Sequence, residues 1–526
     1  MCISIFLFIQ VAIGSSIAGS ADISDSDAYD DGLSSALDIA ADGGNLAATL
    51  DGGRSELVTN RRWILSDNST LEAVVQEDVM PPQRRPNIII MMADNLGWGD
   101  LGCYGGGELR GAPTPCLDQM AAEGLRLTSF YTETQCTPTR AATMTGRLPI
   151  RTGMSLALIP GTGAGMSPNE VTIAKVLSDA GYDTACYGKW HLGDSNDSMP
   201  QNMGFDEYWG TLYYLQAYVA PEKIGYDTAV LPPLMGIVEA KKGENFTAVG
   251  PINSGTLPYI DEQIANKAVA YIEDHANSDR PFFLYLPWTR VHIPDIPHPD
   301  WKGKSRIGDY GDALMELDFH SGMVLDAVRE AGIENDTVVV FFSDNGPTKL
   351  AMPDTGYTPF RGEIATGWDG GIRNPCIFWW PSEIEAGRVS NEIVCSLDLF
   401  NTFANIGGGS VPTDRPIDGV DQTEFILGRE NHSNREHVLI FIGSDLAAIR
   451  WRQFKIHFET YETMESEAVD YSEMPAIYNT ELDPQESVNI ASENDWLFQI
   501  VYRYLQEVQE SFIEYPNAKP HYDWLP

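Results

Sequence analysis

Basic residues, cysteines and long apolar runs are all scarce in this chain of 526 residues. Lysine and arginine number 34 against 75 aspartates and glutamates, so the formal net charge is −41. A surface with this excess of negative charge repels nucleic acids and anionic membranes, which excludes both as main partners. No apolar run reaches the ~18 residues that a spanning helix needs, so we expect no membrane span.

The seven cysteines are scattered along the chain and contain no Cys-X-X-Cys pair. They are too few for a disulfide scaffold, and their spacing does not indicate zinc. The one disulfide that we consider joins Cys103 and Cys116.

The N-terminal part of the chain differs in amino-acid composition from the rest. Residues 1–17 are apolar and residues 18–21 are small, which is typical of a signal peptide at 1–21, although the usual basic leader is missing. A buried N-terminal strand is the alternative. The composition of residues 22–85 predicts an acidic, low-complexity extension.

Potential N-glycosylation sites lie at Asn68, Asn196, Asn245, Asn335 and Asn431. We therefore predict a secreted glycoprotein of an extracellular, periplasmic or lysosome-like compartment.

Short apolar runs alternate with helical patterns from residue 86 onward. The runs at Asn87–Ala93, Pro281–Leu286 and Thr337–Phe342 are typical of strands buried on both faces. Helical patterns cover 171–180 and 311–331. This alternation predicts an α/β domain with a mixed, mostly parallel sheet flanked by helices, at residues 86–434.

The pattern of apolar and polar residues changes again near residue 435. Strand patterns at 438–442, 447–451 and 454–458 and an amphipathic helix at 496–514 predict a smaller C-terminal α+β domain. We expect an antiparallel sheet plus a helix in residues 435–526.

Two predicted strands end in the same dipeptide. Asp94-Asn95 follows one strand and Asp344-Asn345 follows another. The carboxyl ends of parallel strands meet at one edge of a sheet, so two carboxylates and two amide oxygens would lie together there. Oxygen ligands of this kind favour a hard cation, Ca²⁺ before Mg²⁺. The alternative is that each dipeptide only begins a turn.

Basic side chains follow two further strands. Lys189 and His191 lie two apart after one strand, so in extended chain they share a face and can hold an anion between them. His292 follows another strand.

Cys136 lies at the predicted N-terminal tip of a short helix, because Pro138 suits a first helical turn and Gly146 a helix end. The helix N-terminus and Arg140, one turn further, favour an anion there. A buried cysteine at a helix start and a cysteine hydrolase using Cys136 with His191 are the alternatives at this point.

These segments together resemble the type I, formylglycine-dependent sulfatases of the arylsulfatase kind, in the alkaline-phosphatase superfamily. Residues 136–147 match the family's C-x-P-x-R…TGR signature, with Thr139 where many members have serine. The resemblance spans residues 86–491. Within this range, further matching segments lie at 94–100, 188–193, 343–346, 369–373 and 478–484. It implies an alkaline-phosphatase-like fold and the hydrolysis of sulfate esters.

The resemblance also implies roles for individual residues. Cys136 would be oxidised to formylglycine by a transient formylglycine-generating enzyme, and its hydrated aldehyde would attack the sulfur of the ester. Arg140 and His191 would hold and deprotonate the hydrate, and Lys189 and His292 would bind sulfate, with His292 or a lysine protonating the leaving group. The Ca²⁺ ligands would be Asp94, Asn95, Asp344 and Asn345.

Two positions depart from the family pattern. Asn95 replaces an aspartate of many members and removes one negative charge from the metal site. Ile364 stands where many members carry a lysine, and Arg361 or Lys349 would then supply that charge; we take Arg361 as the substrate-binding candidate.

The resemblance leaves three classes of function to compare. A sulfatase would act on a sulfated small molecule, such as an aryl sulfate, or on a sulfated glycan. A related phosphoesterase or phosphonate hydrolase shares the architecture. A secreted protein with an unmodified Cys136 would bind sulfated glycans without catalysis.

Overall fold

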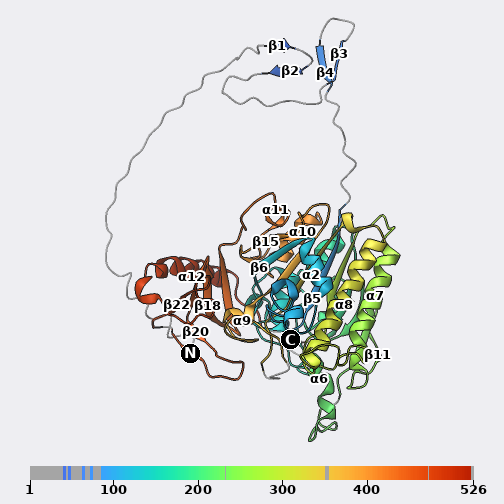
Figure 1. Cartoon of the computed structure of the whole chain (residues 1–526), viewed down its shortest axis with the longest axis vertical. Helices are drawn as coiled ribbons and strands as arrows, with labels where there is room; N and C mark the ends of the chain where they lie inside the picture. The colour runs from blue at the N-terminus through green and yellow to red at the C-terminus, as the bar shows by residue number, and fades with distance from the viewer. Residues whose placement is uncertain are drawn as a thin grey trace. The chain divides into compact units, whose positions relative to one another are not determined.

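The computed structural model describes residues 85–519 apart from 232, 350–354 and 472, together with the backbone of five short strands. Residues 1–84 and 85–526 form two separate compact units. The first unit contains two antiparallel strand pairs, β1 (Ile39–Asp42) with β2 (Asn45–Ala48) and β3 (Arg62–Leu65) with β4 (Leu71–Val74) (Figure 1). The predicted signal peptide lies outside the described residues.

An 11-stranded sheet forms the centre of the second unit, in the order β11-β10-β9-β8-β12-β5-β13-β14-β6-β15, with β16 also paired to β6. Its strands are β5 (Asn87–Ala93), β6 (Leu125–Tyr131), β8 (Asp183–Lys189), β9 (Glu207–Thr211), β10 (Ile237–Lys241), β11 (Thr247–Gly250), β12 (Phe282–Pro287), β13 (Thr337–Ser343), β14 (Arg373–Trp379), β15 (Arg388–Ser390) and β16 (Val394–Cys395).

The middle of this sheet is parallel. Strands β9, β8, β12, β5 and β13 all run in one direction, whereas β14 runs against both β13 and β6. Every residue of β12 and β13 is buried. A strand buried on both faces needs apolar side chains at every position, which is why these runs lack polar alternation. The predicted mixed, mostly parallel sheet is confirmed.

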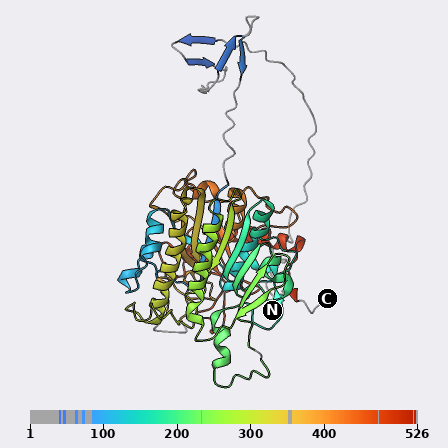
Figure 2. The ribbon, with the colours of Figure 1, turned by 90° about the vertical axis from the view of Figure 1, so that its right-hand side faces the viewer.

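Helices flank the sheet in two groups of neighbours (Figures 1 and 2). One group contains α2 (Pro115–Ala122), α7 (Ile260–His275) and α8 (Asp309–Glu330), and the other contains α3 (Cys136–Thr145), α5 (Ile173–Asp179) and α10 (Asp398–Ile406). Shorter helices are α4 (Pro149–Thr152), α6 (Leu215–Val219), α9 (Asp369–Ile372) and α11 (Thr423–Ile426).

The C-terminal part forms the predicted antiparallel sheet plus helix. Its sheet has the order β17-β18-β19-β22, and helix α12 (Leu497–Glu514) packs its apolar face against it. The four strands are β17 (His437–Ile442), β18 (Asp445–Trp451), β19 (Phe454–His457) and β22 (Ala476–Asn479). Two small pairs complete the strands, β7 (Ala164–Gly165) with β23 (His521–Tyr522) and β20 (Glu459–Thr460) with β21 (Val469–Asp470).

The considered disulfide is wrong, because Cys103 and Cys116 are free thiols. Each thiol lies beside a carboxylate, Asp118 for Cys103 and Asp318 for Cys116. Burial, reinforced by Asp318, raises the pKa of Cys116 to about 12, so this thiol stays protonated.

Candidate active site

The site is built where β5 and β13 end side by side. Ala93 pairs with Ser343 in the sheet register, so the two Asp-Asn dipeptides that follow are neighbours. The backbone N–H of Asn95 donates to Oδ1 of Asp344 over 3.1 Å, and Nδ2 of Asn345 donates to Oδ1 of Asn95 over 2.6 Å. All four polar side chains are buried. The sequence prediction that these residues lie together at one sheet edge agrees with this geometry.

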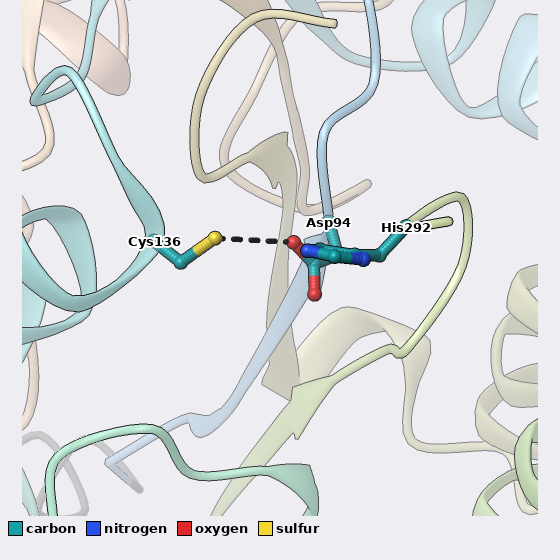
Figure 3. A group of neighbouring side chains, drawn as sticks. All are labelled: Asp94, Cys136 and His292. Atoms are coloured by element: carbon teal, nitrogen blue, oxygen red, sulfur yellow. Dashed lines mark hydrogen bonds between the residues drawn. The ribbon is translucent and has the colours of Figure 1, made fainter. Parts of the chain in front are cut away.

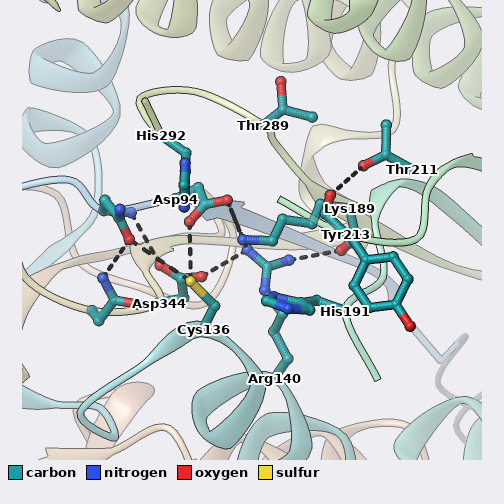
Figure 4. Close-up of polar contacts among 12 residues, drawn as sticks. Asp94, Cys136, Arg140, Lys189, His191, Thr211, Tyr213, Thr289, His292 and Asp344 are labelled. Atoms are coloured by element: carbon teal, nitrogen blue, oxygen red, sulfur yellow. Dashed lines mark hydrogen bonds and ion pairs between the residues drawn. The ribbon is translucent and has the colours of Figure 1, made fainter. Parts of the chain in front are cut away.

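Two buried cations neutralise the two buried carboxylates (Figure 4). Nζ of Lys189 lies 2.6 Å from Oδ2 of Asp94, and the Arg140 guanidinium donates to Oδ2 of Asp344 over 2.7 Å. Burial alone would raise the pKa of Asp94, but the charges of Lys189 and Arg140 lower it below its usual value. Burial and the neighbouring Asp94 raise the pKa of Asp344.

Cys136 begins helix α3, and its side chain points at the end of β5. Its Sγ atom is 3.4 Å from Oδ1 of Asp94, and Asp94, Cys136 and His292 converge within 4.8 Å of one another (Figure 3). The helix ends where Gly146 takes a left-handed conformation, φ 64°. Burial, with the charges of Asp344 and Asp94, raises the pKa of the Cys136 thiol well above its usual value, so it is not a thiolate nucleophile.

Two neutral histidines complete the group. Nε2 of His191 lies 3.0 Å from the carbonyl oxygen of Leu158, so Nε2 carries the proton, and Nδ1 is a buried acceptor with no partner among the described residues. Nδ1 of His292 lies 2.6 Å from the carbonyl oxygen of Ile293, which leaves Nε2 as the acceptor. Burial, with Lys189 nearby, lowers the pKa of both rings, that of His292 to about 4.

The segment Asp369-Gly370-Gly371 packs against Gly346, the residue that follows Asp344-Asn345. The N–H of Gly346 donates to the carbonyl oxygen of Gly371 over 2.8 Å. A Cβ atom on Gly346 would lie 1.9 Å from the carbonyl oxygen of Gly370, so only glycine permits this approach. The close packing holds Asn345 against the end of β5.

The backbone of Arg361 accepts from the N–H of Gly370 over 2.7 Å, but the contacts of its side chain lie elsewhere. Its guanidinium pairs with Glu462, donates to the carbonyl oxygen of Glu486, and lies 3.8 Å from the centroid of the Trp368 ring. Ile364 is buried, and Lys349 is exposed. A role for Arg361 in substrate binding therefore stays a prediction.

Thr137 is a site residue that sequence reasoning missed. Its Oγ1 donates to the carbonyl oxygen of His191 over 2.9 Å and accepts from the N–H of Leu158 over 3.1 Å. The hydroxyl thus connects helix α3 to His191 and to Leu158, the residue whose carbonyl oxygen lies against Nε2 of His191. No sequence pattern marks this role, because it depends on how the loop after α4 folds back.

Comparisons with known proteins decide the family. A family model described as Sulfatase matches residues 86–409, and one described as the C-terminal region of aryl-sulfatase matches residues 433–523. The chain belongs to the sulfatase family. It is therefore a sulfuric ester hydrolase with the alkaline-phosphatase-like fold, which confirms the predicted class.

The similarity extends over most of the sulfatase chain. Human arylsulfatase H is 33% identical over 81% of this chain and 91% of its own length. The N-acetylgalactosamine-6-sulfatase of Canis lupus familiaris is 35% identical over 72% of each chain. Among solved structures, the PsFucS1 sulfatase from Pseudoalteromonas sp. superposes with a TM-score of 0.80 at 33% identity, over 83% of this chain and 92% of the other.

Among the described helices of this sulfatase, none is both long and apolar enough to cross a membrane.

Proposed function

We propose that this sulfatase hydrolyses sulfate esters through a formylglycine made from Cys136, with Ca²⁺ held by Asp94, Asn95, Asp344 and Asn345. The observation that carries the proposal is the position of the Cys136 side chain, which lies against Asp94 at the N-terminus of helix α3 while its thiol is kept protonated. A cysteine hydrolase needs a thiolate, and no hydrogen bond joins Cys136 to His191 among the described contacts.

The residues present fit a hard divalent cation. Asp94, Asp344 and Asn95 offer oxygen atoms, and Oδ1 of Asn345 is a buried acceptor with no partner in the described part of the chain. Two carboxylates and two cations leave this cluster neutral by itself, so a divalent cation would make it positive and suited to an anionic ester. When bound, Ca²⁺ supplies positive charge against a sulfate oxygen, and Mg²⁺ fits the irregular amide-containing set less well.

The formylglycine hydrate would supply a nucleophilic hydroxyl and, through its second hydroxyl, a route to expel sulfate. In this proposal, the unpaired Nδ1 of His191 accepts a proton, and Arg140 fixes the position of helix α3 through its hydrogen bond to the Lys189 carbonyl oxygen, 2.7 Å long. Lys189 binds the sulfate group through Nζ, and His292 would bind it only with Nε2 protonated, because its Nδ1 proton is donated to the carbonyl oxygen of Ile293. Since His292 is neutral at pH 7, we assign the proton of the leaving alcohol to Lys189.

The tryptic peptide Leu127–Arg140 contains Cys136 and tests the proposal directly. From protein made with a formylglycine-generating enzyme, we expect an aldehyde mass that a hydrazide captures, and turnover of 4-nitrophenyl sulfate but not of 4-nitrophenyl phosphate. Cys136→Ala serves as the inactive control. An intact thiol in fully active protein would overturn the proposal.

Access to Cys136 constrains its modification. The side chain is 3% exposed in the folded chain, so we propose that the transient modifying enzyme acts before folding is complete. Conversion of folded, unmodified protein by added modifying enzyme would contradict this order.

We propose that the substrate is a sulfated sugar or an aryl sulfate and that the protein is secreted and N-glycosylated. The name of the canine relative supports a sugar sulfate. The asparagines of four predicted glycosylation sites, at Asn196, Asn245, Asn335 and Asn431, are exposed in the structure. Treatment of the secreted protein with a peptide N-glycosidase should lower its mass; an unchanged mass would argue against glycosylation.

A further inference from the structure

A cavity with a volume of about 400 Å³ lies between the sheet and the C-terminal part of the chain. Its walls combine the catalytic part of the chain with the C-terminal segment 480–484. The lining residues are Trp98, Thr128, Pro359, Phe360, Arg373, Asn391, Thr480, Glu481 and Pro484. The chemistry of sulfate transfer uses none of them.

The cavity is close to the site along the chain and in the sheet. Trp98 follows the proposed metal ligand Asn95 by three residues, which span at most ~11 Å. Arg373 pairs with Tyr131 in the sheet, at the end of β6, and Cys136 follows five residues later. The cavity therefore adjoins the edge of the sheet that carries the active site.

One part of the wall is apolar and aromatic. The rings of Trp98 and Phe360 lie 5.3 Å apart, edge to face, and Pro359 and Pro484 add two further apolar surfaces. Arg373 covers the Phe360 ring at 4.5 Å and keeps it in place. Such walls suit the C–H faces of a ring without requiring charge.

The other part of the wall carries hydrogen-bonding groups with spare capacity. Oδ1 of Asn391 accepts from Thr128, Ser129 and Arg373, which fixes the amide, whereas Nδ2 donates only a 3.4 Å bond to Oε1 of Glu481. The wall thus offers the amide donor of Asn391 and, on Glu481, a carboxylate acceptor.

We propose that this cavity binds an unsulfated sugar ring. A neutral sugar has an apolar C–H face and hydroxyls that both donate and accept, which matches the two parts of the wall. Arg373 is the one cation among the lining residues, and its guanidinium already bonds the carbonyl oxygen of Thr128, Asp369 and Asn391, so the wall offers a sulfate group no unpaired cation. With the carboxylate of Glu481 also in the wall, we infer that the ring in this cavity is not the one that carries the scissile sulfate. The cavity can bind a free sugar whether or not the proposed function is correct. That this sugar belongs to the same glycan as the reacting ester rests on the proposed function.

A cavity of about 410 Å³ elsewhere in the described chain lacks these properties. It lies at the starts of β8 and β9, the end of the strands opposite to Asp94, and is lined mainly by charged groups. Its acids already have partners, since Asp206 pairs with Lys242 and Asp183 with Arg280. This cavity therefore gives no comparable reason to propose a sugar site.

Saturation-transfer difference NMR tests the proposal without catalysis. The probes are unsulfated galactose, N-acetylgalactosamine, fucose and glucose, each with the Cys136→Ala protein. We expect ring-proton signals from at least one sugar that fall about tenfold when Asn391→Ala or Glu481→Gln is added, because the first change removes the amide donor and the second replaces a charged acceptor oxygen with an N–H donor. Asn405→Ala and Glu424→Gln, exposed elsewhere, serve as matched controls.

Signals from no sugar, or signals that Asn391→Ala and Glu481→Gln leave unchanged, would overturn the proposal. So would saturation by 4-nitrophenol but by no sugar, because the cavity would then bind an aryl ring. Far-UV circular dichroism and thermal unfolding of each variant establish that the protein is folded.

Kinetics of the active enzyme provide a second readout. For Asn391→Ala we expect KM for a 6-sulfated N-acetylgalactosamine oligosaccharide to rise about tenfold, with kcat/KM for 4-nitrophenyl sulfate unchanged within about twofold. An equal loss on both substrates would indicate a structural effect and contradict the proposal. If wild-type enzyme hydrolyses neither ester, the proposed function fails, and the NMR result still decides the sugar site.

Discussion

Nζ of Lys189 lies 2.6 Å from Oδ2 of Asp94, and both side chains are fully buried. Arg140 adds a second cation 3.6 Å from the same carboxylate oxygen. The carboxylate that we propose as a ligand of a divalent cation thus also depends on protein cations. Removing one of these cations should change both the free energy of unfolding and the affinity for the metal. Removing the metal should change the free energy of unfolding.

The variant Lys189→Met tests the ion pair. We expect the free energy of unfolding to fall by about 3–5 kcal/mol in EDTA, because the Asp94 charge loses its nearest partner in a buried site. Added Ca²⁺ should restore part of the loss, and kcat/KM should fall by about 100-fold or more. Urea unfolding with and without Ca²⁺ measures the first effect. The control is Lys242→Met, whose exposed pair with Asp206 should contribute less than about 1 kcal/mol.

Asn95→Asp should strengthen Ca²⁺ binding. The change adds a negative charge to the predicted ligand set, and aspartate tolerates the left-handed backbone at this residue, φ 63°. We expect Kd for Ca²⁺ to fall by about tenfold in calorimetric titration of EDTA-treated protein. Asn405→Asp, an exposed asparagine elsewhere, should leave Kd unchanged. A weaker or unaltered Kd for Asn95→Asp would contradict the assignment of this side chain as a ligand.

His292 should make the fold sensitive to acid. Burial lowers its pKa to about 4, so between pH 6.5 and 4 the unfolded chain binds a proton that the folded chain does not. Stability therefore falls as pH decreases through this window, by roughly 3 kcal/mol for this group. His292→Gln should reduce the difference in unfolding free energy between pH 7 and pH 4. An identical pH dependence in the variant would refute the assignment.

Glu133, three residues before Cys136, should have the opposite effect. Burial, with the negative charge of Asp418 nearby, raises its pKa to about 8. The folded chain therefore keeps a proton that the unfolded chain releases above pH 4.5, and stability falls as pH rises from 4.5 to 8. We expect Glu133→Gln to be more stable than wild type at pH 8, by up to about 4 kcal/mol, and nearly equal at pH 4. The exposed Glu424→Gln should show no such difference between the two pH values.

Much of the architecture follows from local patterns. The apolar runs that become β5, β12 and β13 have no polar alternation, so they require burial on both faces and hence a parallel sheet covered by helices. Short alternating segments and an amphipathic helix similarly predict the C-terminal sheet and α12. Disulfide pairing was not predictable, because the contacts of Cys103 and Cys116 with Asp118 and Asp318 depend on how distant segments pack.

The sequence by itself determined the family, the strand-end positions of Asp94 and Asp344, and the placement of Cys136 at a helix start, because each is encoded within a few consecutive residues. Only the tertiary structure decided which nitrogen of His191 is free, since its partner is the carbonyl oxygen of Leu158, 33 residues away. Likewise, the contacts of Arg361 with Glu462 depend on packing across 101 residues. The sugar-sized cavity, whose walls come from segments nearly 400 residues apart, has the same origin: hydrogen bonds and cavities form between chain segments that no local pattern relates.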